Sequence, residues 1–502
     1  MKTFNTAGTC RPNEHYMVDI TERLEIIRKM VAKGDYFCIN RGRQYGKTTT
    51  LAALSDYLKN DYCVFSISFE GLGDSSFSAV ENTCAEFLKI FKRHSRVNGS
   101  SDAIQALLKE VVPLGCKEIA STDFAEIIDE LCALSDKPVV VMIDEVDQAS
   151  NNDGFIKFLG VLRNMFLSRE TFPTFQSVIL AGVYDIKSLI FKMRSDVDMS
   201  LSAKGIADML AEYKADHNMT FDEKFVAQMI RDYTAGYPFL VSRICQIIDA
   251  ERYSWDKDGV LKAVNAILVE RNTLFDNMIK KLDDYPELKQ TLKGILFSGK
   301  TRSYNPDEKY IQIATMFNYI VNKEGKIAVA CRIMEIRLYN LFISEEENSS
   351  FFMQGQIDKS QFIKDGMIDV PHLLERFVVH MNQTYKMNHD NEFIENDARK
   401  VFLTYLRPVI NGIGSYHIEE QTRDHDRMDV VIDYLGKQYV IEMKIWRGNA
   451  YNERGEEQLC RYLEYFDLKE GYLLSFCFNK TKQSGLLPPV ELNGRTLIEA
   501  IV

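Results

Sequence analysis

The sequence predicts an α/β protein of several domains. Three observations support this prediction: short apolar runs alternate with helical segments up to about residue 188, residues 204–260 have a helical pattern, and strand-like runs return near the end of the chain. A chain of 502 residues is long enough for about three domains. We therefore expect two α/β parts separated by a largely helical region.

Composition is that of an ordinary globular protein, with 46% hydrophobic and 26% charged residues. The net charge of −11 provides no global basic field, and no basic run marks a nucleic-acid surface. The ten cysteines are scattered without metal-ligand spacing, which indicates buried thiols in a reducing compartment. The chain starts without an apolar signal segment, and no apolar run approaches the ~20 residues that cross a membrane. We expect a cytoplasmic protein with no membrane partner.

A phosphate-binding pattern lies in the first α/β part. Within residues 36–50, a short apolar strand runs into a turn, which is followed by Gly46, Lys47 and Thr48 and by a helix predicted over 48–58. Gly46 lets the backbone approach a phosphate, and the helix N-terminus presents free N–H groups to it. Lys47 would reach the β- and γ-phosphates of ATP, and Thr48 would hold Mg²⁺.

An acidic strand end adds to this pattern. Residues 137–147 contain five consecutive apolar residues followed by Asp144 and Glu145, which predicts a buried parallel strand with acids at its carboxyl end, where ligands bind. Asp144 would hold Mg²⁺ through water, and Glu145 would polarise the attacking water. A third strand, starting at Ser177, has Ala181 where AAA-type ATPases carry a polar sensor, which argues against fast, phosphate-sensed hydrolysis. The alternative is a buried strand pair with a Gly-Lys helix start.

A β-hairpin is predicted near the end of the chain. Two apolar strand-like runs flank residues 435–436, which read as a two-residue turn. That turn places Tyr434 opposite Lys437 and Asp429 opposite Glu442. Directly opposed residues have Cβ atoms roughly 4.5–5.5 Å apart.

Glu442 and Lys444 point to the same face of this hairpin because side chains alternate along a strand. Two converging carboxylates, Asp429 and Glu442, form an oxygen cage suited to Mg²⁺, and an adjacent lysine orients or activates water. This is the chemistry of metal-dependent phosphodiester cleavage. The alternative is an exposed, solvated hairpin with incidental charges, although a carboxylate within an apolar strand is costly to bury without a partner.

The pattern D-x(12)-E-x-K resembles the PD-(D/E)XK nuclease superfamily, with Arg427-Met428 in place of the proline before Asp429. Gln458 and Tyr462, four residues apart on one face of a predicted helix, resemble the Gln-x-x-x-Tyr element of its exonuclease-like members. The helical run 395–406 offers Glu395 as the additional helix-borne glutamate of such enzymes. The resemblance implies Mg²⁺ as the metal, with Mn²⁺ as an alternative, and nucleic acid as the substrate, DNA being favoured.

The segment Arg41-Gly-Arg43-Gln-Tyr45-Gly46-Lys47-Thr48 matches Arg-x-Arg-x-[Phe/Tyr]-Gly-Lys-[Ser/Thr]. This pattern is typical of the phosphate loop of a bacterial AAA-ATPase-like family that is fused to a C-terminal PD-(D/E)XK domain. The match accounts for Arg41, which stands where the common phosphate-loop pattern G-x-x-x-x-G-K-[ST] has its first glycine. Segments 181–186 and 235–241 also resemble that family. The resemblance implies a P-loop NTPase (AAA-like) core at 1–200, a helical lid at 201–265, a winged helix at 266–345, a linker at 346–371 and a restriction-endonuclease-like α/β domain at 372–502.

Local signals predict further detail in the lid. Asp222 is expected to cap a helix over 223–235, with Gly236 ending it and Pro238 in the following turn. Three arginines are candidates for a γ-phosphate contact, although a solvated helix position is favoured for each: Arg243 in the lid, and Arg163 and Arg169 in trans.

The winged helix is predicted from two helical runs after residue 270, followed by strand-like runs starting at Lys309 and Lys326. Winged helices bind DNA in some proteins and only pack and transmit motion in others.

Together the patterns predict a nuclease that is controlled by ATP, in which ATP binding admits nucleic acid to the second site. Two rivals from other classes are a nucleotide-dependent switch that grips nucleic acid or protein without cutting, and an ATPase scaffold with a structural appendage. A homo-oligomer is compatible with each. The expected catalytic residues are Asp429, Glu442, Lys444, Gln458, Glu395 and Glu145. The expected nucleotide contacts are Arg43, Tyr45, Gly46, Lys47, Thr48, Thr49 and Asp144.

Overall fold

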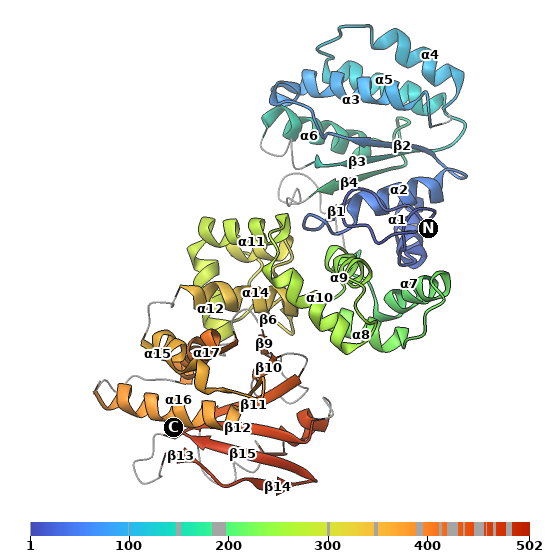
Figure 1. Ribbon diagram of the computed structural model, residues 1–502. Coiled ribbons are helices and arrows are strands. Elements are labelled where there is room, and N and C mark those ends of the chain that lie inside the picture. The colour runs from blue at the N-terminus through green and yellow to red at the C-terminus, as the bar shows by residue number, and fades with distance from the viewer. Residues whose placement is uncertain are drawn as a thin grey trace. The chain divides into compact units, whose positions relative to one another are not determined.

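The structure is a computed structural model. It describes residues 2–98, 100–146, 152–182, 197–298, 302–345, 350–387, 395–410, 414–418, 430–434, 437–445, 456–457, 459–464, 468–477 and 484–502. The chain forms two compact units (Figure 1). Unit 1 consists of Met1–Val260 and Gln312–Tyr319, and unit 2 consists of Leu261–Ile311 and Ile320–Val502.

A four-stranded parallel sheet forms the centre of unit 1, with the order β1-β4-β3-β2. Its strands are β1 (Tyr36–Asn40), β2 (Cys63–Ser68), β3 (Val139–Asp144) and β4 (Ser177–Gly182). Every residue of β3 and β4 is buried. Strands of this kind need apolar side chains on both faces, which is why they appear in the sequence as continuous apolar runs rather than alternating ones. The strand before the phosphate loop and the strand that ends in Asp144 flank β4.

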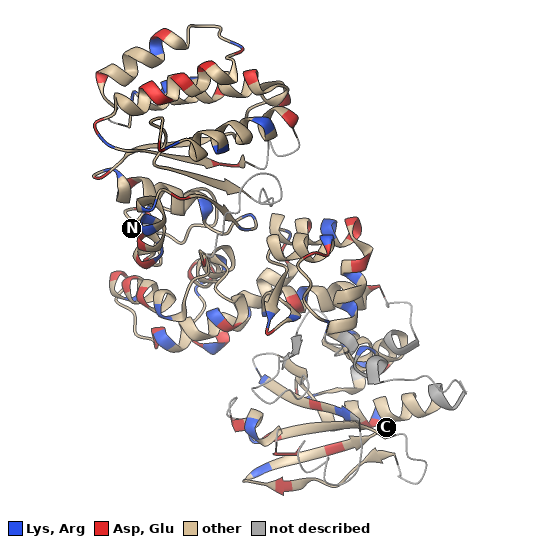
Figure 2. Cartoon of the chain, turned by 180° about the vertical axis from the view of Figure 1, so that it is seen from behind, with Lys and Arg blue, Asp and Glu red and all other residues tan. Residues whose placement is uncertain are grey.

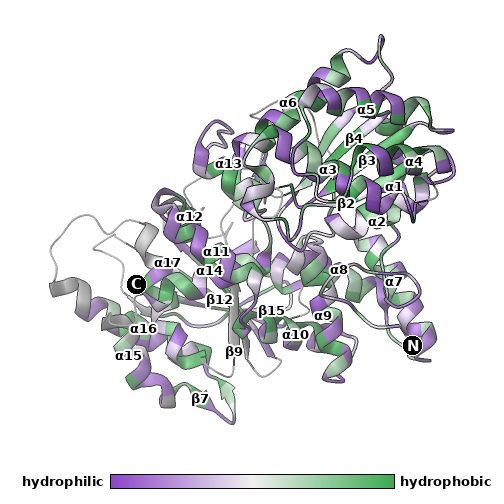
Figure 3. Ribbon diagram, turned by 90° about the horizontal axis from the view of Figure 1, so that it is seen from above, coloured by the Kyte–Doolittle hydropathy of each residue, from purple (hydrophilic) through white to green (hydrophobic). Residues whose placement is uncertain are grey.

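Helices cover both faces of this sheet (Figure 1). On one face Phe65 of β2 stacks on Phe91 of α3, and Tyr36 of β1 packs against Phe166 of α6. Figure 3 shows the strands largely in the colours of apolar residues and the helices with mixed faces. The helices are α1 (Thr21–Ala32), α2 (Lys47–Leu58), α3 (Val80–His94), α4 (Asp102–Val111), α5 (Ser121–Ala133) and α6 (Asp153–Leu167).

Unit 1 continues into three helices, α7 (Ala203–Asp216), α8 (Glu223–Thr234) and α9 (Pro238–Ala250). Asp222 caps α8 as predicted, because its carboxylate accepts from the backbone N–H groups of Lys224 and Phe225. Gly236 follows the helix in a left-handed conformation, and a Cβ there would lie 2.2 Å from the carbonyl oxygen of Leu201. Pro238 is not in a turn but is the first residue of α9, a position where its missing N–H is harmless.

A helical part begins unit 2. Its elements include α11 (Thr273–Asp284), α12 (Pro286–Ser298), the hairpin β5 (Ile320–Lys323) and β6 (Lys326–Val329), and α14 (Arg332–Ser344). Two helices, α10 (Lys257–Val269) and α13 (Lys309–Met316), have residues in both units. The prediction of a strand from Lys309 is wrong. Ile311 and Ala314 are both fully buried and lie three residues apart, so the run buries a helical stripe rather than a strand face.

The segment expected to be a linker forms α15 (Ser350–Asp358) and the short hairpin β7 (Ile363–Lys364) and β8 (Met367–Ile368). Asp358 is 1% exposed, and its carboxylate accepts a hydrogen bond of 2.8 Å from the hydroxyl of Tyr405. A Cβ at Gly355 would lie 2.1 Å from the carbonyl oxygen of Tyr405, so α15 packs closely on α17. This segment therefore belongs to the core of unit 2 instead of forming a bare connection.

A mixed sheet ends the chain, with the order β13-β15-β12-β11-β10-β9 and β14 on β15. The β9–β10–β11 pairs are antiparallel, and β11, β12 and β15 run parallel. The elements are α16 (Val370–Met387), α17 (Glu395–Ile410), β9 (Gly414–Ile418), β10 (Val430–Tyr434), β11 (Lys437–Ile445), β12 (Glu470–Phe476), β13 (Gly485–Leu486), β14 (Val490–Leu492) and β15 (Arg495–Ile501). Within the described ranges, none of the helices has the length and apolar content that a bilayer crossing requires.

Candidate nucleotide and hydrolytic sites

The phosphate loop joins β1 to α2 in unit 1. Gly46 stands at the N-terminus of α2 with a φ of 76°, in the left-handed region that favours glycine, and a Cβ there would meet nothing within 4 Å. Lys47 is only 7% exposed, and its Nζ donates to the carbonyl oxygens of Arg41 (2.9 Å) and Gly42 (3.0 Å). The ammonium group thus lies inside the loop, while the helix N-terminus leaves N–H groups available to an anion.

Thr48 and Asp144, which are 96 residues apart in sequence, are in direct contact. The Thr48 hydroxyl donates a hydrogen bond of 2.6 Å to Oδ2 of Asp144. Asp144 is 6% exposed, whereas Thr48 is exposed. A hydroxyl and a carboxylate are oxygen ligands of the kind that Mg²⁺ prefers. The pair therefore fits a magnesium site beside the phosphate loop.

Glu145 follows directly after β3. Its backbone N–H donates to Oδ1 of Asp144 at 2.9 Å, and its φ of 55° places it in the left-handed region although it is not glycine. Such a conformation costs of order 1–3 kcal/mol and is found most often at functional sites.

Asn40 is a polar residue of this edge that sequence reasoning missed. It ends β1, pairs with Gly182 of β4, and both polar atoms of its side chain are buried without a hydrogen-bond partner. Leaving a buried polar group unsatisfied costs about 1–3 kcal/mol. In the sequence, Asn40 is marked only by its amide side chain at the end of an otherwise apolar strand.

Ala181, at the predicted sensor position, is completely buried in β4.

Of the remaining predicted nucleotide residues, Arg43 and Tyr45 lie within the loop, and Thr49 lies in the first turn of α2. Tyr45 is 5% exposed, and its ring packs against that of Tyr237 with centroids 4.5 Å apart. Arg43 is exposed, and its carbonyl oxygen accepts a hydrogen bond of 2.5 Å from the hydroxyl of Tyr237. The hydroxyl of Thr49 accepts from the backbone N–H of Cys10 at 3.1 Å. The loop is therefore in contact with the helical part of unit 1 through Tyr237.

The three candidate arginines differ in their surroundings. Arg169 donates to the carbonyl oxygen of Gly34 at 2.7 Å, and its guanidinium lies 4.1 Å from the ring centroid of Phe166, so it is engaged within its own unit. Arg243 donates to Gln246 at 2.6 Å. Arg163 is exposed on α6. Exposure of Arg163 is compatible with both roles considered for it, a solvated helix position and a γ-phosphate contact in trans.

The hairpin of the second site has the predicted register. Tyr434 of β10 pairs with Lys437 of β11, and Val430 pairs with Ile441. Asp429 precedes Val430 but lies outside the described residues. Glu442 and Lys444 lie on β11 and are 4% and 7% exposed, so neither is a solvated surface charge.

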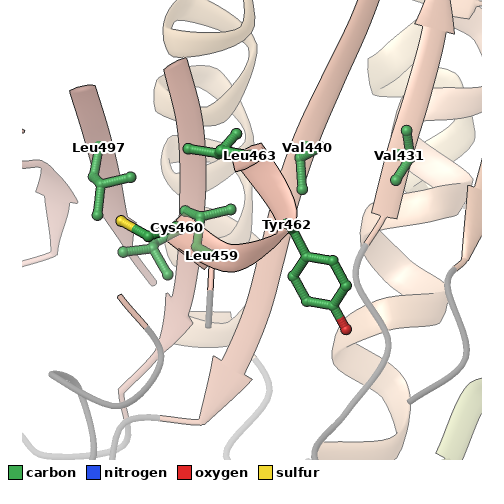
Figure 4. Packing of buried hydrophobic residues seen from close by; sticks show 8 residues of the cluster. Val431, Val440, Leu459, Cys460, Tyr462, Leu463 and Leu497 are labelled. Carbon is green, nitrogen blue, oxygen red and sulfur yellow. The ribbon is translucent and has the colours of Figure 1, made fainter. Parts of the chain in front are cut away.

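Tyr462 lies in a helical segment, residues 459–464, that packs on the same sheet. Figure 4 shows this segment against strand residues that include Val440, which is two positions before Glu442 and so shares its face. The packed cluster consists of Val431, Val440, Leu459, Cys460, Tyr462, Leu463, Leu473 and Leu497. Gln458 lies outside the described residues, and Glu395 is the first residue of α17.

Two further polar residues on this face were not predicted. Ser475 of β12 pairs with Lys444 of β11, and Glu499 of β15 pairs with Leu473 of β12. The Ser475 hydroxyl donates to Oε1 of Glu499 at 2.5 Å, and the two residues are 0% and 9% exposed. A serine and a glutamate inside apolar strands were the signal available in the sequence.

Charge is mixed on the surfaces of both units. Figure 2 shows Lys and Arg interspersed with Asp and Glu along the described helices of each unit. This agrees with a net charge of −11 and with the lack of basic runs in the sequence. Electrostatic attraction to phosphate would therefore have to be local.

The parallel sheet, the phosphate loop at the start of α2 and the Thr48–Asp144 contact together define unit 1 as a P-loop ATPase fold. No family model and no curated protein matches the sequence. Among solved structures, the chain is similar to a Walker-type ATPase of Pyrococcus abyssi, with 12% identity over 67% of this chain and 99% of that one and a TM-score of 0.47.

Two further solved structures are also similar to the chain. They are the ORC2 protein of Aeropyrum pernix in ADPNP and ADP complexes and a mutant of Thermotoga maritima RuvB. The first is 13% identical over 68% of this chain and 97% of that one, with a TM-score of 0.37. The second is 12% identical over 62% and 90%, with a TM-score of 0.30. Structural similarity at this level does not establish a family relationship. The class of unit 1 therefore rests on its own sheet order and loop geometry.

Proposed function

We propose that this protein binds and hydrolyses ATP in unit 1 and thereby controls a Mg²⁺-dependent nuclease in unit 2. The observation that carries the first half is the 2.6 Å contact between Thr48 and Asp144 beside the phosphate loop. A hydroxyl at the start of the helix and a carboxylate at the end of a neighbouring strand are the two groups that a P-loop protein uses to hold Mg²⁺.

Each residue of the nucleotide site has a distinct role in this proposal. Lys47 would leave the carbonyl oxygens that it now contacts and bind the β- and γ-phosphates. Gly46 and the N–H groups at the start of α2 would surround the phosphate chain. Glu145 would orient the attacking water and accept its proton, while Asp144 would hold the metal through water.

The second half rests on two buried charged residues of β11. Glu442 and Lys444 share one face of the strand and are less than a tenth exposed. Buried charges are normally paired or bound to metals. In the proposal Glu442 and Asp429 would supply oxygen ligands for Mg²⁺ and Lys444 would orient water for hydrolysis of a phosphodiester, with Tyr462, Gln458 and Glu395 around the site.

The competing proposal is a nucleotide-dependent switch or scaffold whose unit 2 binds nucleic acid or protein without cutting. The acidic net charge favours the form of this alternative in which unit 2 binds a protein, because nucleic-acid binding is dominated by contacts between basic side chains and phosphates. The carboxylate and ammonium groups retained on β11 favour the nuclease.

Incubation of the purified protein with labelled DNA and RNA, with and without Mg²⁺, Mn²⁺ and ATP, distinguishes the two proposals. We expect metal-dependent cleavage, with DNA as the better substrate, that is lost in Glu442→Gln. The matched control is Glu491→Gln, since Glu491 lies on β14 of the same sheet and is exposed. Metal-dependent binding without any cleavage would favour the switch. Equal cleavage by wild type and Glu442→Gln would exclude the β11 site.

A further inference from the structure

The phosphate loop of unit 1 is held from outside by three residues that belong neither to the loop nor to the sheet. They are Tyr237, at the start of α9, and Phe317 and Asn318, which follow α13. We call these three residues the loop brace. Each of them is more than 190 positions in sequence from the loop residues that it contacts, so the fold alone brings them together.

Tyr237 contacts the loop at two points. Its hydroxyl donates to the carbonyl oxygen of Arg43 at 2.5 Å, and its ring packs edge-on against the ring of Tyr45 at an angle of 65°. Tyr237 is 1% exposed and Tyr45 is 5% exposed. Two buried aromatic rings in this arrangement are worth about 0.5–1.5 kcal/mol beyond their buried area.

The segment after α13 also contacts Tyr45, and it contacts the loop at a second residue, Gly42. The amide of Asn318 donates to the hydroxyl of Tyr45 at 3.2 Å. The carbonyl oxygen of Phe317 lies so close to Gly42 that a Cβ there would be 2.8 Å away. Gly42 has no positive φ, so this close approach, rather than its backbone conformation, is the reason for glycine at this position.

These contacts make the brace sensitive to the occupancy of the loop. Lys47 now donates to the carbonyl oxygens of Arg41 and Gly42. If its ammonium turns to phosphate, both carbonyls lose a charged donor, and any adjustment of the peptide that includes Gly42 would be opposed by Phe317. Close-packed contacts of this kind pass on small displacements instead of absorbing them.

We propose that Tyr237 and Asn318 are positioning residues for the phosphate loop, and that Phe317 and Asn318 pass the state of the loop to the hairpin β5–β6. The hairpin starts at Ile320, two residues after Asn318. The proposal deepens the regulation of the nucleotide site and rests on the proposed binding of ATP. In this proposal the state of the phosphate loop is transmitted through residues Gln312–Tyr319. This stretch is the part of unit 1 that lies between two stretches of unit 2 in sequence.

The test is a double-mutant cycle on the affinity for a non-hydrolysable ATP analogue, measured by calorimetry. Tyr45→Phe keeps the ring and removes the hydroxyl. Asn318→Gly removes the amide and keeps the backbone, because Asn318 has a φ of 57° that glycine adopts readily. We expect each single change to weaken binding about 2–10-fold, the range of one hydrogen bond, and the double change to be no worse than either single one.

Two controls separate this inference from the proposed function. Asn322→Gly changes the same residue type in β5, where Asn322 accepts a hydrogen bond from Gly325, and should leave the affinity unchanged. Lys47→Ala should weaken binding strongly. If wild type binds and Lys47→Ala does not, but the brace variants bind like wild type, the brace is refuted and the nucleotide site stands. A wild type that binds no nucleotide refutes both.

Hydrogen exchange provides a readout that a merely structural contact would not change. In wild type we expect residues 312–323 to differ in protection between the nucleotide-free protein and the protein with the ATP analogue. In Tyr45→Phe that difference should shrink while the analogue is held at saturation. Equal exchange in the two wild-type states would overturn the transmission of the loop's state to β5–β6.

Discussion

Lys47 and Asp144 are almost completely removed from water, and each is in contact with another part of the phosphate loop or its helix. A buried charge is costly unless polar groups surround it. Here backbone carbonyl oxygens hold the ammonium and a hydroxyl holds the carboxylate. Both charged groups therefore have polar partners although they are buried.

Lys47→Ala should weaken ATP binding about 10–100-fold, because it removes a charged contact to phosphate worth about 1.5–3 kcal/mol. Calorimetric titration with an ATP analogue measures this loss. The matched control is Lys59→Ala, since Lys59 follows the same helix and its side chain is 64% exposed. Unchanged affinity in Lys47→Ala would rule out the phosphate-loop assignment.

Glu145→Gln should keep ATP bound and slow its turnover. A carboxylate that orients water stabilises the transition state and contributes little to the ground-state complex. The comparison requires both the dissociation constant and the steady-state rate of phosphate release. Glu110→Gln, at an exposed position of α4, serves as the control. A parallel fall of affinity and turnover would instead assign Glu145 to metal binding or to folding.

Caps and burial decide where the elements of unit 1 begin and end. Asp222 accepts from two backbone N–H groups at the start of α8, and Gly236 ends the same region where no side chain would fit. On the sheet, β3 and β4 end beside each other at the edge that carries Asp144. Local chemistry thus sets where α8 begins, and the parallel pairing places the acidic edge beside the phosphate loop.

Asp222→Ala should lower the free energy of unfolding by about 0.5–2 kcal/mol, because the first turn of α8 loses its side-chain acceptor. Urea denaturation followed by circular dichroism measures the change. Lys224→Ala, an exposed change in the same turn, should stay within about 0.5 kcal/mol of wild type. Equal stability of Asp222→Ala and wild type would show that water replaces the cap at no cost.

On the scale of the whole molecule, two costly polar sites share one chain. If they are linked, nucleic acid must bind the ATP state and the empty state with different affinities, and ATP must respond reciprocally. The segment proposed to carry this linkage, residues 270–345, includes the hairpin β5–β6 that follows the loop brace.

Nucleic-acid affinity should therefore change roughly 5–150-fold between the two states, which corresponds to a coupling of about 1–3 kcal/mol. The measurement uses Glu442→Ala protein, in which we expect cutting to be disabled, with and without a non-hydrolysable ATP analogue. The double variant with Lys47→Ala should lose the response. Equal affinities in both states, together with cleavage rates that ignore ATP, would indicate two independent modules on one chain.

The sequence by itself determined the features that depend on local pattern. The apolar runs predicted β1, β3 and β4, the Gly-Lys-Thr segment predicted the start of α2 to within one residue, and the two-residue turn predicted the pairing of Tyr434 with Lys437. These features follow from side-chain periodicity, turn length and backbone conformation, each of which acts over a few residues.

Only the tertiary structure decided which distant residues meet. It brought Tyr237 and Asn318 to Tyr45, left the amide of Asn40 buried at the sheet edge, and placed Ser475 with Glu499 on the face of Lys444. It also made a helix of the run from Lys309, whose short apolar pattern fits either element until burial selects one. Such contacts depend on strand order and on packing between segments far apart in sequence, which no local pattern encodes.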